Sequence, residues 1–134
     1  MSILKLTKGT NFENEIDKNM KGEAQGALMY AAMAYLAGER GLNEVKDILM
    51  KSAVDELRHA ALYSVLNGSI NEDIFKTMKN ILPLESAGET NLFEFAKKLR
   101  SQGFEEAAKE IESVANDEGN HSERLTYLTE NFGK

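Results

Sequence analysis

The second half of the chain repeats the first half at a distance of 62 residues. Apolar residues and glycines recur at this spacing, as in the pairs Phe12 and Ile74, Gly41 and Gly103, and Leu66 and Leu128. Within each half the apolar residues are spaced by three and four, which is typical of amphipathic helices. The sequence is also rich in Ala, Leu, Glu, Lys and Met, which favour helix. We therefore predict an all-α protein whose two halves fold alike.

Glycines divide each half into two helical segments. The predicted helices cover about residues 11–39, 43–66, 74–102 and 104–132, and Asn43 is expected to cap the second. The short turns at Gly41 and Gly103 predict two antiparallel hairpins. Pro83 falls inside the third helix, where we expect a kink rather than a break. The expected fold is an antiparallel four-helix bundle of two pseudo-repeated hairpins, a single domain over residues 1–134 with its core at about 11–132.

Composition argues against several classes of function. No cysteine is present, so disulfide and thiolate chemistry are absent. The formal net charge of −6 is unfavourable for binding a nucleic-acid backbone. The longest nearly uncharged stretch, residues 24–38, is too short to span a membrane. The first residues show no signal-peptide pattern, so we expect a cytoplasmic protein that binds neither nucleic acid nor membrane.

Both histidines of the chain occur in the sequence Asp-Glu-x-x-His, at residues 55–59 and 117–121. A glutamate and a histidine three residues apart lie on the same face of a helix. The repeat also aligns Glu23 with Glu85. At 1.5 Å per residue, Glu23 and Glu56 lie at nearly the same height, roughly 22 to 27 Å from their hairpin turn. The candidate metal ligands are Glu23, Glu56, His59, Glu85, Glu118 and His121.

Four carboxylates and two imidazoles at one level of a bundle core indicate a site for two divalent cations, because unpaired buried charges are costly. Oxygen donors with one imidazole per metal favour two iron ions, with manganese or a mixed pair as the alternative. Glu56 and Glu118 are expected to bridge the metals, with Glu23 and Glu85 terminal. Asp55 and Asp117 are expected to accept a hydrogen bond from the histidine of the opposite motif. Tyr30, on the face of Glu23, is expected to bond a ligand carboxylate.

The order Glu, Glu-x-x-His, Glu, Glu-x-x-His resembles the ferritin-like diiron-carboxylate superfamily. The chain is similar in particular to the erythrin domain of rubrerythrins, as in Lys-Gly-Glu at 21–23 and in residues 95–98, 103–108 and 121–124. The resemblance implies a peroxidase in oxidative-stress defence, in which two iron ions reduce hydrogen peroxide. It also implies a separate electron-donor protein such as a rubredoxin, since the cysteines of a rubredoxin domain are absent. We further expect a homodimer.

Other functions stay open at this point. Rubrerythrins carry a further glutamate three residues after the third-helix ligand, where this chain has Gly88, and Glu89 is the candidate substitute. The alternatives to peroxide reduction are a ferroxidase that stores or delivers iron, as in ferritins, and a diiron oxidase that uses dioxygen. A structural or partner-binding bundle stabilised by metal is the remaining alternative.

Overall fold

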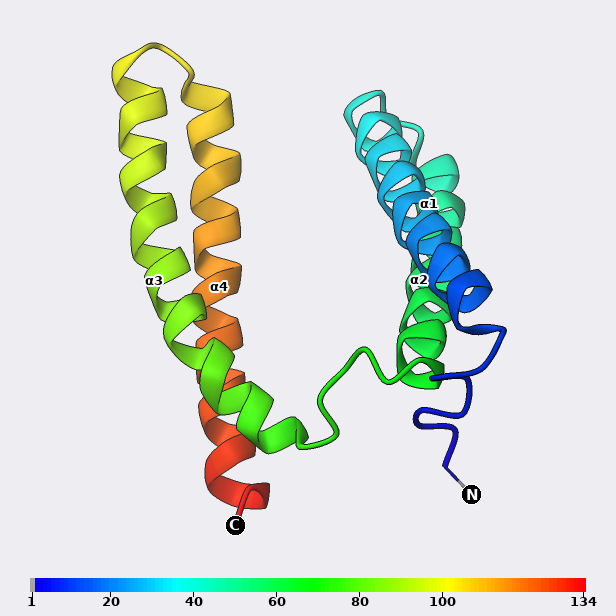
Figure 1. Ribbon diagram of the computed structural model, residues 1–134. Coiled ribbons are helices and arrows are strands. Elements are labelled where there is room, and N and C mark those ends of the chain that lie inside the picture. Colours follow the sequence, from blue (N-terminus) through cyan, green and yellow to red (C-terminus); the bar gives the residue numbers. More distant parts are fainter. Residues whose placement is uncertain (1) are drawn as a thin grey trace. The chain divides into compact units, whose positions relative to one another are not determined.

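The computed structural model describes residues 2–134, and all of its regular structure is helical (Figure 1). The four helices are α1 (Glu13–Glu39), α2 (Asn43–Leu66), α3 (Ile74–Ser101) and α4 (Glu105–Phe132). These bounds confirm the predicted all-α class and the number of helices. Within residues 2–134, none of the helices combines the length and the apolar composition that a membrane span requires.

The helices pack as two hairpins, α1 with α2 and α3 with α4 (Figure 1). The chain divides into two compact units at Glu72 and Asp73, so each unit contains one hairpin. The predicted pairing of the helices is therefore confirmed.

The apolar residues that are buried within the hairpins are all alanines. The buried apolar residues are Ala34, Ala37, Ala53 and Ala60 in the first hairpin and Ala96, Ala108 and Ala115 in the second. Four of these alanines correspond under the 62-residue repeat, Ala34 to Ala96 and Ala53 to Ala115. Small side chains let two helices approach closely, but they bury little apolar area. Large apolar side chains of the described residues consequently stay at least partly exposed within each hairpin.

The two hairpin turns have the same backbone geometry. Gly41 and Gly103 have φ angles of 73° and 86°, which are accessible to glycine at little cost. The amide of the residue after each glycine bonds the carbonyl five residues earlier, Leu42 to Ala37 and Phe104 to Leu99, at 2.9 Å. This is the Schellman arrangement that ends a helix. The capping prediction for Asn43 was wrong, because Asn43 is already the first helical residue and α2 has no side-chain cap.

Helix α3 continues through Pro83, as predicted, and Figure 1 shows that it bends in its N-terminal half. Proline lacks the amide hydrogen that would bond the carbonyl four residues earlier, which accounts for a bend at this point. The helix begins at an Asp73 cap, whose side chain accepts a hydrogen bond from the Lys76 amide at 3.0 Å. Glu85 therefore lies on unbroken helix, two residues after the proline.

Candidate metal centre

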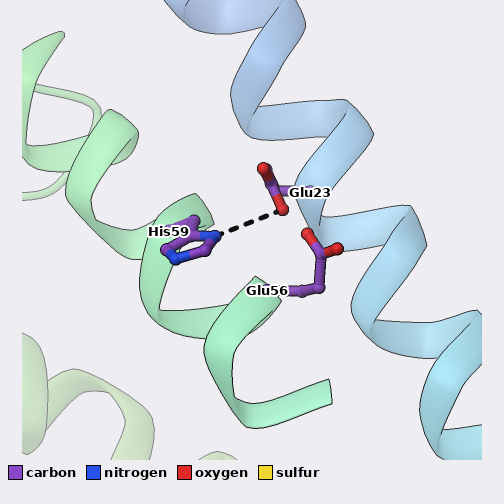
Figure 2. Close-up of side chains that lie close together, drawn as sticks. All are labelled: Glu23, Glu56 and His59. Carbon is purple, nitrogen blue, oxygen red and sulfur yellow. Dashed lines mark ion pairs between the residues drawn. The ribbon is translucent and has the colours of Figure 1, made fainter. Parts of the chain in front are cut away.

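The first hairpin brings together Glu23 from α1 and Glu56 and His59 from α2. One ligand atom from each of these residues lies within 4.8 Å of the others. Figure 2 shows the imidazole of His59 turned toward the Glu23 carboxylate, with Nδ1 3.6 Å from Oε2. This separation is too long for a hydrogen bond. The three side chains thus surround a common point without satisfying one another.

The second hairpin repeats this group with Glu85 from α3 and Glu118 and His121 from α4. The Nδ1 atom of His121 lies 3.4 Å from Oε2 of Glu85 and 3.8 Å from Oε2 of Glu118. In both hairpins the histidine presents Nδ1 to the glutamate of the other helix. The sequence repeat therefore extends to the arrangement of the side-chain atoms.

A glycine adjoins the Glu-x-x-His glutamate in each hairpin. A Cβ added at Gly26 would lie 3.4 Å from the Glu56 carboxylate carbon, and one at Gly88 would lie 3.8 Å from Cγ of Glu118. Both glycines stand three residues after the first glutamate of their group. The 62-residue repeat aligns Gly26 with Gly88. Their recurrence one helical turn after Glu23 and Glu85 was the available signal.

Two carboxylate oxygens in the groups are buried without a partner. Oε2 of Glu23 and Oε2 of Glu85 are the buried side-chain polar atoms of the described residues that make no hydrogen bond. Leaving such an atom unsatisfied costs about 1–3 kcal/mol, and more when it is charged. The two atoms are equivalent under the repeat, and each faces its histidine. A cation bound within each group would satisfy the unpartnered oxygen of that group.

The negative charge of the Glu118 carboxylate is only partly balanced by neighbouring positive charge. Its pKa is raised above the usual value of 4.5, first because Glu85 hydrogen-bonds its protonated form, and further by burial and the charge of Glu85. His121 opposes this rise only in part. Two adjacent carboxylates of this kind are stable as anions when a metal ion binds between them.

The donor set therefore fits a metal. Each group offers two carboxylates and one imidazole nitrogen, with no sulfur ligand, which suits iron or manganese. All six residues predicted as ligands belong to the two groups: Glu23, Glu56 and His59 in one, and Glu85, Glu118 and His121 in the other.

The residues predicted to support the ligands lie outside the two groups. Asp55 is exposed and bonds Arg58 at 2.9 Å, one turn further along α2. Tyr30 is half-buried on α1, and its predicted hydrogen bond to a ligand carboxylate stays a prediction. Asp55 and Asp117 were each predicted to accept a hydrogen bond from the histidine of the other hairpin. These hydrogen bonds stay predictions.

Glu89 approaches the neighbouring helix at a glycine. Its carboxylate lies so close to Gly119 that a Cβ at Gly119 would overlap it. Glu89 does not belong to the group of Glu85, Glu118 and His121. Its role as a substitute ligand likewise stays a prediction.

Comparison with known proteins gives two relatives, although no protein-family model matches the chain. The chain is 29% identical to a rubrerythrin of Porphyromonas gingivalis, over 96% of its own length and 74% of that protein. This distant similarity and the two carboxylate–histidine groups are compatible with a ferritin-like diiron fold. The chain is also 30% identical over 129 residues to the uncharacterized protein MJ0746 of Methanocaldococcus jannaschii, over 96% of its own length and 92% of that protein. The chain belongs to the same family as MJ0746.

Proposed function

We propose that this protein is a non-haem diiron oxidoreductase that reduces hydrogen peroxide in defence against oxidative stress. In this proposal the two groups together hold two iron ions, with Glu56 and Glu118 as bridging ligands and Glu23 and Glu85 as terminal ligands. The observation that carries the proposal is the pair of equivalent buried oxygens, Oε2 of Glu23 and Oε2 of Glu85, that have no partner. The similarity to a rubrerythrin over nearly the whole chain supports peroxide as the substrate.

Two ferrous ions, when bound, would supply the two electrons that the reduction of hydrogen peroxide to two water molecules requires together with two protons. The four carboxylates balance the charge of two divalent cations. His59 and His121 present Nδ1 to the carboxylates, so each must be neutral with its proton on Nε2 in order to bind a metal. Gly26 and Gly88 have no side chain, so no Cβ from the neighbouring helix lies against Glu56 or Glu118 at these positions.

The electrons that return the iron to the ferrous state come from outside these residues. The 134 residues contain no cysteine, so they cannot form the four-thiolate iron site of a rubredoxin domain. We propose a separate electron-donor protein such as a rubredoxin.

The test is anaerobic loading with ferrous iron, followed by stopped-flow mixing with hydrogen peroxide or dioxygen. We expect about two iron ions per chain and oxidation at least tenfold faster with peroxide than with dioxygen. Glu85→Gln should lose most of the iron and the rapid oxidation, whereas Glu44→Gln, a change at an exposed glutamate of α2, should retain both.

Other results would favour the alternatives. Loading of many iron ions per chain driven by dioxygen would favour a ferroxidase that stores iron. Comparable or faster oxidation by dioxygen at two iron ions per chain would favour an oxidase. A protein that binds no metal and whose melting temperature is unchanged by added iron would contradict the diiron proposal altogether.

A further inference from the structure

The segment that precedes α1 closes the open end of the first hairpin, opposite the Gly41 turn. Figure 1 shows this segment, in dark blue, beside the end of α2. The Lys5 amide donates a hydrogen bond to the Val65 carbonyl at 3.0 Å. The Thr7 amide donates one to the Leu66 carbonyl at the same distance. The last carbonyls of a helix have no partner within that helix, so these bonds attach the segment to the end of α2.

Asn67 links the same segment to α1. Its Oδ1 atom accepts a hydrogen bond from the Thr7 hydroxyl at 2.5 Å, and its Nδ2 atom donates one to the Glu13 carbonyl at 2.8 Å. Asn67 is 5% exposed, the one buried polar residue within 2–134. A buried amide without partners is unfavourable, so its burial and its two hydrogen bonds depend on each other. We call residues 5–10 together with Asn67 the clasp.

The backbone of the clasp adopts a specific conformation. Lys5 has a φ of 64°, in the left-handed region that residues other than glycine seldom adopt. Gly68, with a φ of 65°, adjoins it so closely that a Cβ there would overlap Cγ of Lys5. Such a conformation persists where surrounding contacts hold it in place. The contacts with α2 thus fix the conformation of the clasp.

The corresponding end of the second hairpin is built differently. Thr129 stands in place of Asn67, and its hydroxyl bonds two carbonyls of its own helix, at 2.9 and 3.1 Å. The residues that correspond to 5–10 are 67–72, which lie in the first unit. The two hairpins share their fold and their ligand arrangement, so neither feature requires a clasp.

The clasp lies at the end of the hairpin that carries the ligand group. Glu23 lies ten residues after the start of α1, and Glu56 lies ten residues before the end of α2. The group is therefore nearer to the clasp than to the Gly41 turn. Without a metal ion, the carboxylates of Glu23 and Glu56 repel each other and favour separation of the two helices at this end.

We propose that the clasp keeps this end of the hairpin closed in the metal-free protein and thereby preforms the group of Glu23, Glu56 and His59 for its metal ion. The inference rests on the metal binding proposed above and adds how the ligands are kept in place before the ion arrives. The clasp opposes local opening of the helix ends. A group that is closed for only part of the time binds its ion more weakly, in proportion to the closed fraction.

The first test is amide hydrogen exchange on the full chain after treatment with a chelator. Thr7→Val removes the hydroxyl and retains the shape of the side chain. We expect the amides of residues 16–22 and 60–66 to exchange about five to ten times faster in this variant, the opening that loss of one hydrogen bond permits. The amides of α3 and α4, in the other unit, should keep their exchange rates.

Two matched variants are the controls for this measurement. Thr7→Ser retains the hydroxyl and should exchange as the wild type does. Thr129→Val removes a hydroxyl from the corresponding end of the second hairpin and should leave the exchange of residues 16–22 and 60–66 unchanged.

The second test is anaerobic titration of the metal-free protein with ferrous iron. Asn67→Ala removes both hydrogen bonds of Asn67, so we expect the open form to predominate and iron to bind about tenfold more weakly. The affinity of Thr7→Val should lie between those of Asn67→Ala and the wild type. Thr7→Ser and Thr129→Val should bind iron as the wild type does.

Three results would overturn the proposal: unchanged exchange of residues 16–22 and 60–66 in Thr7→Val, equally faster exchange throughout α3 and α4, or unchanged iron affinity in Asn67→Ala. If Asn67→Ala does not fold, the exchange and the iron affinity of Thr7→Val decide. A wild-type protein that binds no iron contradicts the diiron proposal, whereas iron binding that is insensitive to the clasp contradicts this inference alone.

Discussion

Glu118 has opposite effects on folding and on metal binding. Its carboxyl adjoins Glu85 in the second hairpin, and the pKa of Glu118 is raised in consequence. A raised carboxyl pKa means that the folded state favours the protonated form more than the unfolded chain does. Ionisation of Glu118 therefore destabilises the metal-free fold, while the same carboxylate is required to bind the metal.

We predict that Glu118→Gln raises the melting temperature of the metal-free protein at pH 7, because glutamine is neutral. The gain should disappear below pH 4.5, the usual pKa of the group, where wild-type Glu118 is protonated in both states. Thermal unfolding of chelator-treated protein between pH 4 and 8 measures this, and Glu44→Gln is the control without an effect. An equal or lower melting temperature for Glu118→Gln at pH 7 would contradict the prediction. The same variant should lose most of its bound iron.

The helices are set by local signals that act at their ends. Each hairpin turn depends on one glycine with positive φ, and a Cβ at Gly41 or Gly103 would contact nothing within 4 Å. Substitution there therefore tests the backbone conformation alone, without a steric clash. Gly22, inside α1, also has open space around its missing side chain but adopts no positive φ.

Alanine should consequently have opposite effects at two glycines of the first hairpin. Gly41→Ala is expected to lower the free energy of unfolding by about 1 kcal/mol, the usual cost of a left-handed alanine. Gly22→Ala should raise it by about 0.5–1 kcal/mol, because alanine favours helix. Urea unfolding of the metal-free protein measures both changes. An unchanged or higher free energy of unfolding for Gly41→Ala would show that the turn does not need glycine, and a lower one for Gly22→Ala would contradict the expectation for the helix.

At the scale of the whole molecule, metal binding distinguishes one dinuclear centre from two separate sites. Each hairpin by itself supplies two carboxylates and one histidine. Two independent groups would bind their ions without regard to each other. In the proposed centre the bridging glutamates contact both ions, so damage to one group weakens binding at the other.

We therefore predict that Glu23→Gln, a change in the first hairpin alone, reduces the iron content from about two ions per chain to well below one. The double variant with Glu85→Gln should lose little more than either single variant. Iron analysis after desalting gives these values, and Glu15→Gln, an exposed position on α1, serves as the control. Retention of one tightly bound ion per chain in Glu23→Gln would show two independent sites.

The sequence alone determined the helices and the candidate ligands. Periodic apolar residues and terminal glycines act over one or two turns, so the ranges of all four helices could be read from them, as could the hairpin turns at Gly41 and Gly103. The Glu-x-x-His spacing likewise places Glu56 and His59 on one helix face without any tertiary contact. The capping prediction for Asn43 failed because a cap depends on the backbone geometry of a single residue.

Only the tertiary structure decided how close the helices come and which atoms meet. It showed that the buried apolar residues of each hairpin are alanines, and that Nδ1 of each histidine faces the glutamate of the other helix. It also left one oxygen of Glu23 and one of Glu85 buried without a partner. These features depend on the packing of residues distant in sequence, which periodicity cannot specify because it describes each helix alone.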